Sequence, residues 1–207
     1  MTFLENLDKK IREVMNSERF TKYNFPKSTH EIPNCPFKTF ESLIENIENM
    51  NAVVIHDMEG SDFAFSTIAT RYESILLYIA LMTPYVVTFL VISSAFWLHN
   101  YWLLTAIIFP FLSAFFTSPY FPHVPTKTII PYTAVLMLGI GGFRNSMPMM
   151  FFFGGYFLCH VFSKLHRDIY SVTIFKRAFA LESVFILLHT LGNIILLDKN
   201  LQEFKTV

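Results

Sequence analysis

The fold class is decided by residues 75–121, which read ILLYIALMTPYVVTFLVISSAFWLHNYWLLTAIIFPFLSAFFTSPYF and contain no Lys, Arg, Asp or Glu. Charged residues make up 15% of the 207-residue chain, against about 25% in an ordinary soluble domain. A soluble protein of this size cannot solvate so long a charge-free stretch. The sequence therefore predicts an integral membrane protein and excludes a soluble enzyme, a secreted disulfide scaffold and a nucleic-acid binder. The formal net charge is zero, so the overall charge does not point to an anionic partner.

Working outward from this stretch, apolar runs predict five membrane segments. As a helix, Ile75–Trp97 spans about 34 Å, enough to cross roughly 30 Å of hydrocarbon. The third and fourth runs are each short for a full crossing of the membrane. They form either two thin spans or, together, one re-entrant hairpin, in which case three spans remain. The expected fold class is an all-α, polytopic membrane helix bundle. The runs are 75–97, 101–118, 129–143, 147–163 and 179–197.

The N-terminal region, residues 1–74, holds most of the charge and is expected to lie outside the membrane. Apolar residues recur at three- and four-residue steps in residues 1–16 and 39–51, which predicts two amphipathic helices. The run Ala52–Ile55 is too short for its period to distinguish a strand from a helical turn. The predicted divisions are an N-terminal region 1–74, a transmembrane domain 75–197 and a short tail 198–207.

The distribution of positive charge predicts an orientation. With five segments, every Lys and Arg except Arg144, Lys199 and Lys205 falls on the side of the N-terminal region. Loops rich in Lys and Arg stay on the cytoplasmic side of a membrane. The sequence therefore predicts a multi-pass protein with its N-terminus on the cytoplasmic or equivalent side and its C-terminus opposite.

Polar residues within the apolar half are the candidate functional residues, because a polar group in hydrocarbon is costly unless it has a partner. His160 lies in the fourth segment, and Glu182, His189 and Asn193 lie on one face of the predicted fifth helix. These residues suit a proton or ion path, or a haem held between His160 and His189, since imidazole titrates near neutral pH and binds metals. The favoured interpretation is hydrogen bonding across a helix interface, with no cofactor and no metal.

A second group of candidate residues is basic. Lys164, Arg167, Lys176 and Arg177 follow the fourth segment and are expected to lie in a loop at the cytoplasmic lipid headgroups. A specific contact with lipid phosphate is the weaker alternative.

The function predicted from the sequence is that of a non-catalytic integral membrane subunit, or an interaction or assembly factor, of a larger membrane complex. No catalytic motif is found, and 24 Phe supply apolar contact surface. The expected partners are membrane lipid and other membrane-protein subunits, with no nucleic acid. One alternative is a small homo-oligomeric transporter or channel that uses Glu182 and His189 as a proton or ion path. A second alternative is a membrane enzyme that acts on lipid.

Overall fold

The computed structural model describes residues 2–17, 26–32, 35, 37–56, 62–117 and 126–198. Within these residues the fold is mostly helical, as predicted, and contains one two-stranded sheet. The predicted tail beyond Asp198 lies outside the described residues. In chain order the elements are α1 (Phe3–Met15), η1 (Thr29–Glu31), α3 (Phe40–Glu48), β1 (Ala52–His56), α4 (Asp62–Ile68), α5 (Arg71–Trp97), η2 (Tyr101–Ile108), α6 (Phe109–Thr117), α7 (Thr126–Phe143), α8 (Met147–Ala178), α9 (Glu182–Thr190) and β2 (Ile194–Asp198).

The chain forms two compact units. The terminal unit combines Met1–Arg71 with Tyr170–Val207, and the central unit is Tyr72–Ile169. Helix α8 contributes its first part to the central unit and its last part to the terminal unit. Segments from both halves of the chain therefore fold together in the terminal unit, although the long apolar stretch separates them in sequence.

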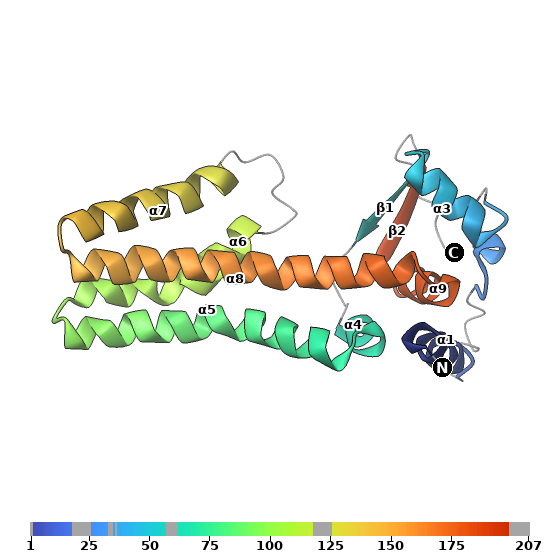
Figure 1. The fold of residues 1–207 in the computed structure, drawn as a ribbon, viewed down its shortest axis with the longest axis horizontal. Helices are drawn as coiled ribbons and strands as arrows, with labels where there is room; N and C mark the ends of the chain where they lie inside the picture. The colour runs from blue at the N-terminus through green and yellow to red at the C-terminus, as the bar shows by residue number, and fades with distance from the viewer. Residues whose placement is uncertain are drawn as a thin grey trace. The chain divides into compact units, whose positions relative to one another are not determined.

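The sheet of the terminal unit pairs β1 with β2 in antiparallel register, with Ala52 opposite Asp198 (Figure 1). The run at 52–55, for which the sequence leaves two possibilities, is thus a strand. Along β2, Ile194 and Leu196 are 1% and 0% exposed, and the residue between them is less buried. This alternation is typical of a strand with one face on a core.

Helix α1 begins with a capping box. The Thr2 hydroxyl accepts a hydrogen bond from the Glu5 amide at 3.3 Å, and Glu5 Oε2 accepts one from the Thr2 amide at 2.9 Å. This exchange satisfies amides that have no partner within the helix. Leu7, Ile11 and Met15 are spaced four residues apart and form the buried face of α1. Helix α1 packs against α9, so the two helices share the core of the terminal unit.

The structure differs from the predicted fifth membrane segment, residues 179–197. Helix α9 is nine residues long, and the chain then turns and enters β2. Gly192 has a φ of 73°, and the Asn193 amide donates to the Leu188 carbonyl at 2.9 Å, which is the pattern of a Schellman cap that ends a helix. Residues 183–189 are all buried. The run is apolar because it forms the core of a compact unit, and composition alone does not distinguish such a helix from a membrane segment.

The pairing of β1 with β2 bears on the predicted position of the C-terminal part of the chain. Strand β1 precedes α5, the first long apolar helix, and β2 ends at Asp198. Hydrogen-bonded strands of one sheet lie on the same side of any membrane, because a bilayer cannot separate backbone partners. The structure therefore gives no support to the predicted position of the C-terminus opposite the N-terminal region, and the C-terminus itself lies outside the described residues. That prediction depended on counting residues 179–197 as a crossing.

In the central unit, tight turns join α5 to η2 and α7 to α8. At the end of α5, the Asn100 amide donates to the Ala95 carbonyl at 2.9 Å, and His99 has a φ of 49°. Helix α7 ends in the same way, with Asn145 at a φ of 50°. Both turns are helix caps that reverse the chain within a few residues.

The core of the central unit is built around a close approach of α8 to α5. A Cβ at Gly155 would lie 2.5 Å from Val91 Cγ2, so only glycine fits at this position. The Cys159 thiol donates to the Pro84 carbonyl at 3.4 Å and lies 3.7 Å from the Thr88 hydroxyl. The buried residues of this core are Val91, Ala95, Leu103, Ala106, Phe109, Ala134, Tyr156 and Cys159.

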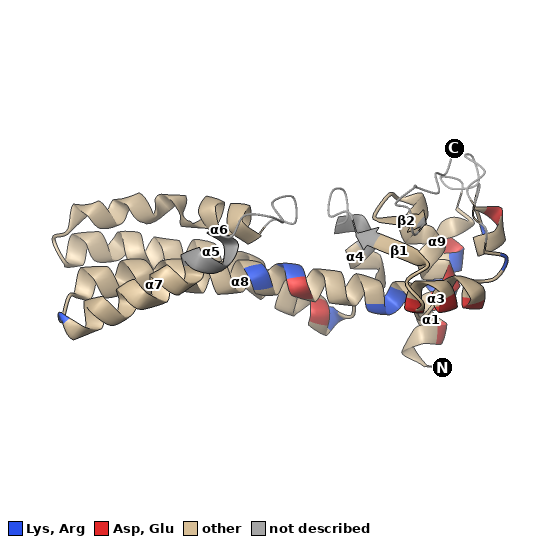
Figure 2. Ribbon diagram, turned by 90° about the horizontal axis from the view of Figure 1, so that it is seen from above, with Lys and Arg blue, Asp and Glu red and all other residues tan. Residues whose placement is uncertain are grey.

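Among the described residues, α5 is the one helix that is both long and apolar enough to cross a membrane. Of its most apolar window, 22% is buried, so most of this stretch of α5 is not covered by other described residues. Val86 and Phe89, for example, are 56% and 68% exposed. Tyr101–Thr117 and Pro131–Phe143 are apolar but shorter. In Figure 2, the charged residues gather on α1, α3 and the later part of α8.

The predicted basic loop is helical in the structure. Lys164, Arg167, Lys176 and Arg177 all lie on α8, which continues without a break. After Gly155 the rest of α8 contains no Gly or Pro, so nothing in the sequence ends the helix where the apolar run ends. The first two of these residues belong to the central unit and the last two to the terminal unit.

Candidate functional site

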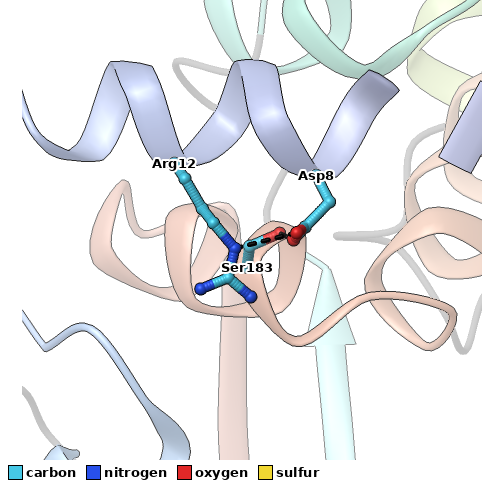
Figure 3. A network of polar contacts seen from close by, with 3 residues as sticks. All are labelled: Asp8, Arg12 and Ser183. Atoms are coloured by element: carbon cyan, nitrogen blue, oxygen red, sulfur yellow. Dashed lines mark hydrogen bonds and ion pairs between the residues drawn. The ribbon is translucent and has the colours of Figure 1, made fainter. Parts of the chain in front are cut away.

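A network of polar contacts joins α1 to α9 in the terminal unit. Asp8 Oδ1 accepts a hydrogen bond from the Ser183 hydroxyl at 2.6 Å, and Asp8 Oδ2 accepts one from Arg12 Nε at 2.8 Å (Figure 3). Asp8 and Arg12 are four residues apart on α1 and so share a face. Ser183 lies in the first turn of α9. One carboxylate therefore links two helices that are far apart in the sequence.

These contacts favour the ionised form of Asp8. The hydrogen bond from Arg12 lowers the pKa of Asp8, and the bond from Ser183 adds to this, although partial burial acts in the opposite direction. Asp8 in turn raises the pKa of Arg12. The side chains of Arg12 and Asp8 are 62% and 30% exposed, so their ion pair contributes little to stability. Its main effect is to fix the position of the Arg12 guanidinium.

Glu182 makes a second link within the terminal unit. Its Oε1 accepts hydrogen bonds from the Thr29 amide at 2.8 Å and from the Thr29 hydroxyl at 2.7 Å. Thr29 begins the short helix η1 and is 1% exposed, so these two donors have no access to water. Glu182 therefore holds η1 against the start of α9.

A cleft of about 210 Å³ lies beside these contacts, lined by Arg12, Met15, Asn16, Lys27, Glu182 and Ser183. Its walls carry side chains of both charges together with a hydroxyl and an amide, a set that can hydrogen-bond a small polar group. In the described part of the chain, no group of three or more His, Cys, Asp or Glu residues could hold a metal ion. What the cleft offers is recognition of a polar group.

The four predicted polar residues belong to two different units. His160 lies in the central unit, whereas Glu182, His189 and Asn193 belong to the terminal unit. His160, His189 and Asn193 are 8%, 7% and 0% exposed. Asn193 follows the Gly192 turn and is not part of α9. A haem between the two histidines, and an ion path along one membrane helix, therefore gain no support from this arrangement.

Each of the two histidines packs near an aromatic ring that lies one helical turn before it. The ring centroids of Tyr156 and His160 are 6.5 Å apart, and those of Phe185 and His189 are 6.3 Å apart. Contacts of this kind contribute to packing between buried rings. The geometry thus favours structural roles for both histidines.

Of the predicted basic residues, Arg177 has a defined aromatic contact. Its guanidinium carbon lies 4.6 Å from the centroid of the Phe3 ring, a cation–π contact that joins α8 to α1. Arg177 therefore has a structural role in the terminal unit in addition to any contact with lipid.

Helix α3 has an exposed acidic face. Glu41, Glu45 and Glu48 are exposed and are spaced so that they share one side of the helix. None of the three forms an ion pair with another described residue. Elsewhere on α3, the ring of Phe40 lies 5.9 Å from that of Phe185 in α9. Helix α3 is thus fixed to the terminal unit while its acidic face remains open.

Sequence reasoning missed Asp8, Arg12, Thr29 and Ser183. The i, i+4 spacing of Asp8 and Arg12 is a local signal that could have been used. The contacts made by Thr29 and Ser183 join residues 153 and 175 positions apart, and a single sequence carries no local sign of such pairs.

Comparison of the chain with protein-family models, with curated proteins and with solved structures finds no match.

Proposed function

We propose that this chain is a multi-pass membrane protein with four membrane segments: α5, η2 with α6, α7, and the first part of α8. An α-helix rises 1.5 Å per residue and a 3₁₀-helix about 2.0 Å. The eight residues of η2 and nine of α6 therefore reach about 30 Å, and the 18 residues of α7 reach about 27 Å. These lengths are close to the roughly 30 Å of a hydrocarbon core. The extended 3₁₀ geometry of η2 compensates for the shortness of the second segment.

The distribution of positive charge supports four segments better than five. With four segments, every Lys and Arg except Arg144 falls on the side of the terminal unit. This asymmetry is what the positive-inside rule expects. The terminal unit is therefore assigned to the cytoplasmic or equivalent side.

The proposed role is that of a non-catalytic subunit or interaction factor of a larger membrane assembly. The observation that carries this proposal is the terminal unit, in which segments from both ends of the chain build one compact body with an exposed acidic face. Carboxylates on one face of a helix repel one another. A basic segment of another membrane subunit would relieve this repulsion and supply complementary charge.

The transporter alternative depended on Glu182 and His189, and the positions and contacts of these residues do not favour it. Glu182 and His189 lie in the terminal unit, and Glu182 accepts two hydrogen bonds from Thr29. A carboxylate held in this way supports the fold, so these two residues do not favour a proton or ion path.

The four-segment topology predicts that tags at the two chain ends share one side of the membrane. Protease added to sealed inside-out vesicles is expected to remove both terminal tags and to spare a tag inserted in the turn at 144–146. Right-side-out vesicles should show the reverse pattern, because the pairing of β1 with β2 keeps both strands on one side. Terminal tags on opposite sides would contradict four segments, and extraction of the chain by alkaline carbonate would contradict membrane embedding altogether.

Replacing Glu41, Glu45 and Glu48 together with Gln is expected to weaken the association with partner subunits about tenfold or more. Each exposed ion pair contributes up to about 1 kcal/mol, and 1.4 kcal/mol corresponds to a factor of ten. The size of the assembly in mild detergent, measured by light scattering against protein concentration, reports this change. Raising the salt concentration should weaken the unmodified assembly in the same direction.

The matched control is Glu13→Gln, which removes an exposed carboxylate from α1. This variant should assemble as the unmodified chain does. A triple variant with unchanged assembly and an unchanged salt response shows that α3 is not the docking face. A chain that stays a single monomer under all of these conditions rules out the subunit role.

A further inference from the structure

A shallow, largely open apolar groove runs along one face of α7 and ends at a cation; it is lined by Val135, Leu136, Gly139, Ile140, Phe143 and Arg144. Gly139 leaves the groove open at its middle, since a Cβ built there would meet no atom within 4 Å. Leu136 and Phe143 are 64% and 93% exposed. The groove therefore has one apolar wall and one charged end.

The length of the groove matches one leaflet of a bilayer. From Val135 to Phe143 the helix rises about 12 Å, and half of the hydrocarbon core is about 15 Å thick. Arg144 follows Phe143 directly, in the turn that joins α7 to α8. With α7 as a membrane segment, the apolar wall faces acyl chains, and the guanidinium lies at the depth of the headgroups.

Arg144 is unusual for its position. It is exposed and forms no ion pair with another described residue. In the four-segment topology, Arg144 is the only Lys or Arg of the sequence on its side of the membrane. The positive-inside rule disfavours cations on that side. A planar guanidinium presents paired donors that match the oxygens of a phosphate group.

We propose that this groove binds one anionic phospholipid, with an acyl chain along Val135–Phe143 and the headgroup phosphate on Arg144. The inference rests on the membrane embedding described under the proposed function. The phosphate neutralises the charge of Arg144. The acyl chain covers the surface of α7 at Gly139, where no side chain fills the groove. It supplies no chemistry, and its binding stabilises the end of the α7–α8 hairpin.

The test is photo-crosslinking of the full-length chain in nanodiscs that contain equal amounts of phosphatidylglycerol and phosphatidylcholine. Either one lipid or the other carries a diazirine in its acyl chain, and crosslinked peptides are identified by mass spectrometry. On the peptide that contains Val135–Phe143, the anionic lipid is expected to give about threefold more crosslinks than the zwitterionic lipid. A single exposed ion pair produces a ratio of this size.

Arg144→Gln should bring that ratio close to one, and Arg144→Lys should retain part of the preference. Lys164→Gln is the matched control, because Lys164 lies on α8 and does not line the groove. Equal crosslinking by both lipids in the unmodified chain, or a preference that survives Arg144→Gln, overturns the inference and leaves membrane embedding intact. Crosslinks absent from α5, α6, α7 and α8 alike would instead mean that the membrane proposal itself is wrong.

Discussion

Phe185→Ala is expected to destabilise the terminal unit by about 3–5 kcal/mol, the usual cost of removing a buried Phe ring. Phe185 is 0% exposed, and its ring lies 5.9 Å from that of Phe40 and 6.3 Å from that of His189. Its loss leaves a cavity between α9 and α3. Amide hydrogen exchange of the peptides that contain β1 and β2 measures the effect, and exchange faster by a factor of about a hundred to a few thousand is expected there.

Phe89→Ala provides the control for this measurement. Phe89 is also an aromatic residue in an apolar helix, but it is 68% exposed and belongs to the central unit. Its removal should leave exchange in β1 and β2 unchanged. Equal protection of these strands in the Phe185→Ala variant and the unmodified chain would show that α9 does not form the core of the terminal unit.

Glu182→Ala is expected to cost about 2–4 kcal/mol, because it leaves two buried donors of Thr29 without an acceptor. Glu182→Gln retains a carbonyl oxygen at the same place and should cost less than about 1.5 kcal/mol. The difference between the two variants isolates hydrogen bonding from loss of charge. Thermal unfolding followed by circular dichroism, with exchange of the Thr29 amide as a local readout, distinguishes them.

The interpretation of Glu182 as a structural residue depends on the order of these two variants. If Gln destabilises the chain as strongly as Ala, the negative charge matters more than the hydrogen bonds to Thr29. If neither variant changes stability or exchange, the contact with Thr29 does not hold η1 in place, and Glu182 becomes available for another role.

Much of the helical structure can be predicted from local sequence. The charge-free stretch predicts helix α5, because an apolar run of this length is typical of a long helix. Helices α1 and α3 lie within the two segments whose apolar residues recur at helical spacing. The continuation of α8 beyond its apolar run was also open to prediction, because its later half contains neither Gly nor Pro.

The strand β2 and the short helix α9 could not be predicted in the same way. Their residues form an apolar run with the composition of a membrane segment, and only tertiary contacts distinguish the two. The informative local sign is Gly192, which has a positive φ and ends the helix. Strand β1 is equally ambiguous alone, because its partner β2 lies far along the chain.

The candidate site was the least predictable part of the molecule. The sequence predicts functional roles for polar residues in the apolar half because hydrocarbon makes such groups costly, but Glu182, His189 and Asn193 lie in the terminal unit. The hydrogen bonds of Asp8 to Ser183 and of Glu182 to Thr29 connect opposite parts of the sequence. Their existence depends on the topology, which local patterns do not determine.

The pairing of β1 with β2 imposes an order on biosynthesis. Translation runs from the N-terminus, so β1 leaves the ribosome long before β2 has been made, and every helical hairpin is produced in between. Until then the N-terminal segments lack the part of their core that α9 and β2 supply. A partner subunit of the kind proposed above, if it recognises the finished terminal unit, would therefore select chains whose translation is complete.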